Sequence, residues 1–101
     1  MEELKELEVL VVLEVTGLQN KEKLEKHVKK EGFLIVEGEE FAYSGKSTTT
    51  TFSTKAYILE VFRKGLEKAG FEECNMIFQI GELPWQAYKF DKNTNDFEQV
   101  K

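Results

Sequence analysis

Residues 8–16 constrain the fold of this chain more than any other part of its sequence. They read Glu-Val-Leu-Val-Val-Leu-Glu-Val-Thr, and β-branched residues, which favour strands, dominate the segment. Its middle is apolar on both faces, which is typical of a strand with neighbours on both sides in a sheet. The longest uninterrupted apolar run, residues 9–13, is far shorter than the roughly 20 residues needed to cross a bilayer. We therefore expect this segment to be a central strand of a globular domain, with no membrane span.

Two segments have the periodicity of amphipathic helices. Residues 21–30 follow Asn20, whose short polar side chain is a good N-cap, and carry a narrow apolar stripe. Residues 55–69 carry a wider stripe, and Ser53 or Thr54 is expected to cap that helix. The apolar positions of the two helices are Leu24, Val28, Ile58, Leu59, Val61, Phe62, Leu66 and Ala69.

The segments between and after these helices favour extended structure. A second strand is expected over residues 33–43, with a bulge or loop at 37–40 around Gly38. Ser44-Gly45-Lys46 is a turn signal, and the threonine-rich residues 47–52 after it have strand propensity. These two strands are expected to form a hairpin. A last core strand is expected at 74–80, with a short edge strand at 85–90.

The resulting order, β-α-β-β-α-β, predicts an α+β domain with the ferredoxin-like split βαβ fold. Residues 24–33 and 62–71 also have apolar and charged residues at matching positions, and both segments end in Gly-Phe. This similarity supports a fold with two similar halves. In this fold two helices cover one face of a four-stranded antiparallel sheet, and the other face stays open. We expect one domain over residues 1–90 and a flexible C-terminal tail over residues 91–101.

Charge and cysteine content narrow the classes of partner. The formal net charge is −5, which opposes binding of polyanions and argues against a nucleic-acid partner. The single cysteine, Cys74, excludes an internal disulfide and fits a reducing compartment. No secretory signal is apparent at the N-terminus. These features predict a cytoplasmic protein that does not associate with membranes.

Alternation along the first strand divides its side chains into two sets. The set that contains a charge, which we assign to the open face, is Leu10, Val12 and Glu14. Thr48 and Thr50 of the expected third strand would lie beside Leu10 and Val12 on that face. An open sheet face that is partly apolar usually meets a partner, and a second copy of the same chain is the commonest one. We therefore expect a homodimer, joined by this face or by an edge strand, with a further protein partner as an additional expectation.

Three aromatic residues, Trp85, Tyr88 and Phe90, follow the last core strand within six positions. They are interpreted either as the cap of one end of the core or as a docking patch, because Trp and Tyr are typical interface anchors. In the docking interpretation they extend the interaction site formed by Leu10, Val12, Thr48 and Thr50.

Residues with catalytic or ligand-binding chemistry are few. Gly45-Lys46-Ser47-Thr48 resembles the end of a phosphate-binding loop, but Glu40 stands where that motif needs glycine, and a strand rather than a helix is expected to follow. His27, the only histidine, is expected at the surface or at its boundary, and Cys74 is expected to be buried and inert. The glutamates near Gly38 and in the turn before Cys74 are expected to be solvated. No metal site and no cofactor are predicted.

The chain is similar in size and predicted topology to the small CRISPR-associated ribonucleases. Members of that family carry an aspartate at the end of the first strand, where this chain has Glu14-Val15-Thr16. The resemblance implies a metal-dependent nuclease in which Glu14 of each subunit holds Mg²⁺ across a two-fold axis. The leading hypothesis is a non-enzymatic interaction or regulatory module, with this nuclease and a metabolite-sensing domain as alternatives.

Overall fold

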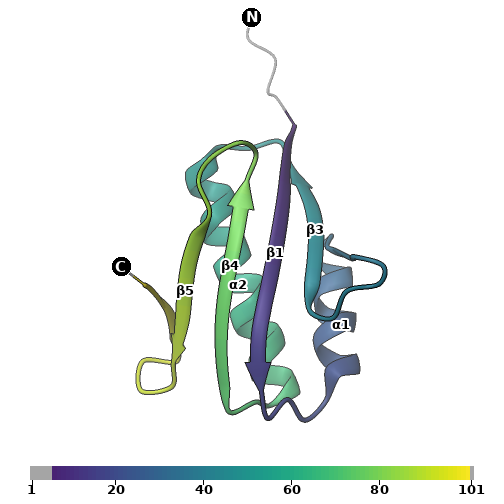
Figure 1. The fold of residues 1–101 in the computed structure, drawn as a ribbon, viewed down its shortest axis with the longest axis vertical. Coiled ribbons are helices and arrows are strands. Elements are labelled where there is room, and N and C mark those ends of the chain that lie inside the picture. Colours follow the sequence, from purple (N-terminus) through teal and green to yellow (C-terminus); the bar gives the residue numbers. More distant parts are fainter. Residues whose placement is uncertain (1–5, 101) are drawn as a thin grey trace, which may run out of the picture.

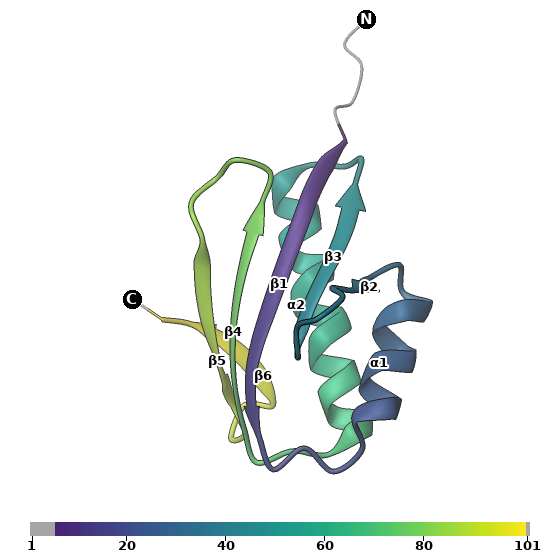
Figure 2. The same cartoon turned by 45° about the vertical axis from the view of Figure 1, so that its right-hand side comes forward.

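The computed structural model describes residues 6–100 as a layer of two helices packed on one face of a single sheet (Figures 1 and 2). In chain order the elements are β1 (Leu7–Thr16), α1 (Lys21–Lys30), β2 (Leu34–Ile35), β3 (Ala42–Ser47), α2 (Thr51–Ala69), β4 (Glu73–Ile80), β5 (Gln86–Asp91) and β6 (Asp96–Gln99). Within the described residues, no helix is both long enough and apolar enough to span a membrane.

The sheet has six strands, all paired antiparallel, in the order β2-β3-β1-β4-β5-β6. β1 lies between β3 and β4, as expected from its apolar character on both faces. The arrangement of the first four strands and the two helices is compatible with a ferredoxin-like fold. The expected sheet of four strands is too small, because β5 and β6 extend it beyond β4.

Helix α1 has the bounds that its sequence predicts. The side chain of Asn20 accepts a hydrogen bond from the Lys23 amide at 3.2 Å, which satisfies a donor that the first turn leaves free. Leu24 and Val28 are fully buried against the rest of the core. Gly32 follows the helix with φ of +99°, a conformation that costs glycine little and other residues more.

Helix α2 begins four residues earlier than predicted, and the third strand predicted at residues 47–52 is wrong. β3 ends at Ser47, Thr50 is the N-cap, and the helix starts at Thr51. The Thr50 hydroxyl accepts a hydrogen bond from the Ser53 amide at 3.1 Å. Short polar side chains bond readily to nearby amides, so a run of threonines serves a helix start as well as a strand. Thr48 and Thr50 therefore do not lie beside Leu10 and Val12 on the open face.

Replacing Thr50 with alanine should lower the free energy of unfolding by about 1 kcal/mol, because the Ser53 amide loses its acceptor. Thr48→Ala is the matched control, since Thr48 lies in the connecting loop before the cap. We expect that variant to stay within about 0.5 kcal/mol of the wild type. Urea denaturation followed by far-UV circular dichroism measures both values. Equal losses in the two variants would contradict the assigned cap.

The turn predicted at Ser44-Gly45-Lys46 is also wrong, because these residues lie inside β3. The hairpin turn lies earlier, between β2 and β3, where the Val36 amide donates to the Ala42 carbonyl at 2.9 Å. Gly45 faces the ring of Phe33, and a Cβ at this position would lie 3.1 Å from that ring. The glycine therefore permits close packing within a strand instead of marking a turn.

Aromatic pairs connect the layers of the core. Phe62 of α2 packs against Phe33 and Tyr43, with ring centroids 5.2 and 5.3 Å away. Phe78 of β4 stacks on Tyr88 of β5 at 5.4 Å. Burial of several aromatic rings in one cluster makes them a major contribution to stability.

The C-terminal residues are part of the sheet, which corrects the expected flexible tail. β6 pairs with β5, and Phe97 is buried against Phe90 with ring centroids 5.2 Å apart. β5 is therefore an internal strand and not the expected edge strand. Phe97 is the single apolar residue between positions 91 and 99, and its burial against Phe90 holds this segment on the core.

Candidate functional site

The open face of the sheet is the side of β1 that carries Leu10 and Val12. Val9, Val11 and Leu13 are buried beneath the helices, whereas Leu10 and Val12 are only partly buried on the opposite side. Glu14 is exposed on the same side as Val12, in agreement with the alternation of the strand.

The strand register places a row of apolar side chains across this face, three from the neighbouring strands β1, β4 and β5 and one from the residue that follows β6. Val12 pairs with Ile77, and Ile77 pairs with Ala87. The amide of Val100 then donates to the Ala87 carbonyl at 2.9 Å. Ile77 is 42% exposed and Val100 is 51% exposed. We call this set the apolar row, and its members are Val12, Ile77, Ala87 and Val100.

A second row, of charged and polar residues, runs parallel to the apolar row two positions along the strands. Glu14 pairs with Asn75, Asn75 with Lys89, and Lys89 with Glu98. Among the described residues, Glu14 and Lys89 form no ion pair. We call this set the polar row; it carries charges of both signs at one end of the open face.

Only part of the predicted aromatic patch is accessible. Trp85, two positions before Ala87, is 46% exposed. Tyr88 and Phe90 are buried on the helix side, where Tyr88 stacks on Phe78 and Phe90 packs edge-on against Phe71. Their side chains alternate with those of Ala87 and Lys89 along β5, so burial of one set requires exposure of the other. Tyr88 and Phe90 thus belong to the core and not to a docking surface.

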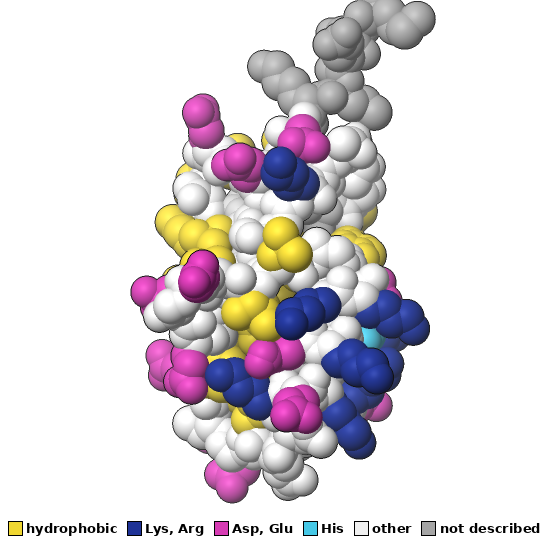
Figure 3. Space-filling model, turned by 90° about the vertical axis from the view of Figure 1, so that its right-hand side faces the viewer, with side chains coloured by type: hydrophobic (Ala, Val, Ile, Leu, Met, Phe, Trp, Pro, Cys, Tyr) yellow, Lys and Arg dark blue, Asp and Glu magenta, His cyan; other side chains and the backbone are white. Residues whose placement is uncertain are grey.

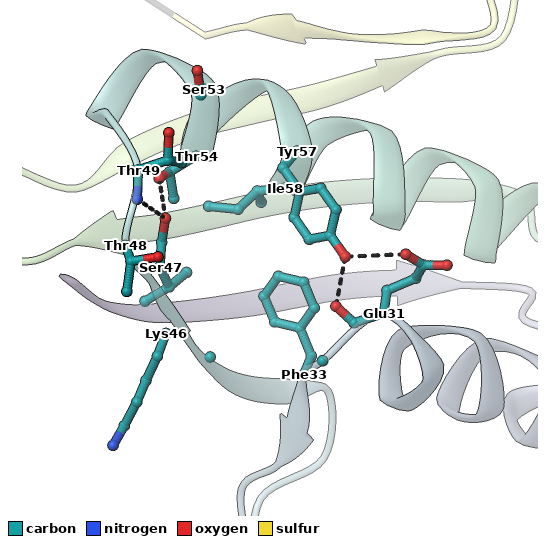
Figure 4. A pocket seen from close by; sticks show the side chains of 13 residues that line it. Glu31, Phe33, Lys46, Ser47, Thr48, Thr49, Ser53, Thr54, Tyr57 and Ile58 are labelled. Carbon is teal, nitrogen blue, oxygen red and sulfur yellow. Dashed lines mark hydrogen bonds between the residues drawn. The ribbon is translucent and has the colours of Figure 1, made fainter. Parts of the chain in front are cut away.

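The residues Gly45-Lys46-Ser47-Thr48 border a pocket of about 460 Å³ between β3 and the start of α2 (Figure 4). A helix, and not the predicted strand, follows this segment. The Ser47 hydroxyl lies 2.6 Å from the Thr54 hydroxyl, and Thr54 donates to the Thr50 carbonyl at 2.8 Å. These hydroxyl groups therefore bond to one another and to the backbone.

Charged groups at this pocket are also engaged. The Lys46 ammonium group lies 3.4 Å from Glu6 and points away from the hydroxyl groups (Figure 4). At the other end, the Tyr57 hydroxyl donates to the Glu31 carbonyl oxygen at 2.6 Å and lies 3.0 Å from its carboxylate. Partial burial and the Glu31 carboxylate raise the pKa of Tyr57. An occupant of this pocket would therefore meet side chains that already have hydrogen-bond or ion-pair partners, together with the carboxylate of Glu31.

Cys74 is buried in β4, as its sequence position predicts. Burial, with a smaller contribution from the Glu14 carboxylate, raises the pKa of its thiol to about 12. A thiol with this pKa carries almost no thiolate at neutral pH, and the thiolate is the reactive form. Cys74 therefore acts as a small apolar core residue.

Glu14, the residue on which the nuclease alternative depends, is exposed on the open face beside Asn75 in the neighbouring strand. Within residues 6–100, no group of three or more His, Cys, Asp or Glu side chains is placed to hold a metal ion.

His27 differs from its predicted surface position. Only 8% of the residue is exposed, because the side chain lies between α1 and α2. A Cβ on Gly65 of α2 would lie 3.2 Å from the imidazole ring, which shows how closely the two helices approach. Sequence periodicity placed this histidine beside the apolar stripe, but it gave no indication that Gly65 of the other helix lies across from it, so the burial was missed.

The chain has no detectable counterpart in the comparisons with known proteins. No family model matches it, and no match was found among curated proteins or among solved structures. The functional argument consequently depends on the surfaces of this molecule.

Proposed function

We propose that this chain is a non-enzymatic interaction module that forms a homodimer through the open face of its sheet. We also propose that β1–β4 with the two helices form a ferredoxin-like domain to which β5 and β6 add two strands. A cytoplasmic location is part of the proposal, because the single buried cysteine fits a reducing compartment.

The observation that carries the proposal is the apolar row. The helices cover the opposite face, so these four side chains have no layer of the described chain above them (Figure 2). A continuous apolar strip across three strands and the residue after β6 differs from single exposed apolar residues, which are ordinary on protein surfaces. Trp85 adds an aromatic side chain near the same region, and tryptophan is enriched at the centres of interfaces.

The register of the sheet makes the open face complementary to itself. A two-fold axis along β4 would exchange β1 with β5, so that Ile77 meets the partner's Ile77. The same operation places Val12 opposite the partner's Ala87 and Glu14 opposite the partner's Lys89. Opposite charges would thus face each other twice beside the apolar contact, once on each side of the axis, as a self-complementary interface requires.

Ile77→Glu should convert the dimer to a monomer and raise the dimer dissociation constant by about 100-fold or more, because the two-fold axis brings two carboxylates together. Size-exclusion chromatography with light scattering measures the mass. The fold should survive, since Ile77 is already 42% exposed in the single chain. Phe52→Glu is the matched control: Phe52 is 82% exposed on α2, and its replacement should leave the mass unchanged. A monomeric wild type would contradict the proposal.

Exchanging the charges of Glu14 and Lys89 distinguishes a dimer formed through the open face from a dimer formed through an edge strand. Glu14→Lys and Lys89→Glu should each weaken the dimer, and the double variant should recover most of the affinity. This recovery requires that the two positions meet across the interface, which pairing of edge strands does not provide. A dimer insensitive to both single changes and to Ile77→Glu would indicate edge pairing through β2 or β6.

A further inference from the structure

Basic side chains surround a hollow of about 360 Å³ on the helix layer, on the opposite side of the sheet from the open face. Figure 3 shows lysine side chains gathered around the single histidine on this side of the molecule. We call the hollow the basic groove. The residues that line it are Lys23, Lys26, His27, Lys30 and Lys68.

The imidazole of His27 is held in place at this groove. Its Nδ1 lies 3.3 Å from the ammonium group of Lys68. Because an ammonium group has no acceptor, Nδ1 accepts this hydrogen bond and the ring is neutral, with its proton on Nε2. Nε2 is buried and has no hydrogen-bond partner among the described residues. Packing against Gly65 restricts movement of the ring.

Among the described residues, no carboxylate lies within ion-pair distance of the four lysines that line the basic groove. In the part of the chain that the structure describes, Lys21, Lys46, Lys64 and Arg63 form ion pairs, whereas the four lysines of the groove form none. Burial and then the charge of Lys68 lower the pKa of His27, with smaller effects in the same direction from Lys30 and Lys64. Only Glu31 acts in the opposite direction. Four lysines without an ion pair thus line one hollow of a chain whose net charge is −5.

We propose that the basic groove binds a compact anion that carries at least two phosphate groups. The volume suits a small ligand and not a folded partner. Lys23, Lys26 and Lys30 follow one face of α1 over about 10 Å, which is more than a single phosphate group contacts. Lysine ammonium groups bind phosphate as point charges, and the repulsion among four of them would be relieved by the ligand.

Titration of the full-length protein with sodium pyrophosphate tests this proposal. Because His27 is the only histidine, its imidazole gives one Cε1–H signal in NMR spectra, and its pKa can be followed directly. Bound pyrophosphate should raise that pKa, since a nearby anion favours the imidazolium form. Lys30→Ala and Lys68→Ala should each weaken binding about tenfold, the effect of losing one charged hydrogen bond. Lys29→Ala is the control on the same helix, exposed and outside the groove, and should change affinity less than about twofold.

Three results would overturn the proposal. The first is a His27 pKa that stays constant at saturating pyrophosphate. The second is a loss of binding in Lys29→Ala as large as that in Lys68→Ala, which would indicate general charge attraction. Binding of single-stranded RNA without any response to pyrophosphate would assign the groove to nucleic acid instead. The Ile77→Glu variant should bind pyrophosphate like the wild type, so failure of the dimer does not affect this test.

Discussion

Replacing Phe62 with alanine is expected to lower the free energy of unfolding by about 3–5 kcal/mol, the range for truncating a buried phenylalanine. Phe62 is completely buried on α2 and contacts the rings of Phe33 and Tyr43. Its loss removes apolar contact area and leaves a cavity between α2 and the β2–β3 hairpin. Domains of this size are stable by only about 5–15 kcal/mol, so a large share of the stability disappears.

Phe52→Ala provides the matched control, because it removes the same side chain from the same helix at an 82% exposed position. We expect this variant to stay within about 0.5 kcal/mol of the wild type. Urea unfolding at one fixed protein concentration measures both variants, since dimerisation makes apparent stability depend on concentration. Similar losses for Phe62→Ala and Phe52→Ala would contradict the assignment of the buried face of α2.

Ending the chain after Asp91 is expected to cost at least about 3 kcal/mol of stability. The deletion removes β6 and with it Phe97, which covers Phe90 in the core. It also removes Lys92, whose ammonium group lies 4.7 Å above the ring of Phe71 and donates to the Phe71 carbonyl. β5 would then become an edge strand with unpaired backbone groups and a greater tendency to aggregate.

Two point variants separate the contribution of the buried ring from that of the strand. Phe97→Ala should account for most of the loss, whereas Glu98→Ala, at the exposed neighbouring position of β6, should have an effect below about 0.5 kcal/mol. Thermal and urea unfolding give the values. A truncated chain as stable as the wild type would mean that the removed residues behave as part of the flexible tail predicted for residues 91–101.

Local sequence patterns were sufficient to predict the secondary structure of each segment that has one strong periodicity. The doubly apolar residues 8–16 predicted a central strand, and the alternation within them separated Leu10 and Val12 from the core. The stripe of Leu24 and Val28, with Asn20 before it, predicted the bounds of α1. In these segments burial and local propensity favour the same structure.

Other segments were compatible with two kinds of secondary structure, and contacts in the folded chain selected one of them. Residues 48–52 could extend as a strand or start a helix, and the bonds among Ser47, Thr50 and Thr54 hold the helix start. The sequence around Gly45 is typical of a turn, yet in the structure this glycine lies inside β3, where a Cβ would be in tight contact with the ring of Phe33. Each choice depends on a side chain that is distant in sequence or on a competing hydrogen bond.

Residue types and their spacing were enough to predict the α+β class, the two helices, the central strand and the face on which Leu10 and Val12 lie. The six-strand sheet, the burial of Tyr88 and Phe90, and the burial of His27 among lysines from two helices became visible only in the folded chain. The fold also aligned Val12, Ile77, Ala87 and Val100 into one row. Strand register and helix contact join residues far apart in the chain, and local propensity carries no information about which distant residues will meet.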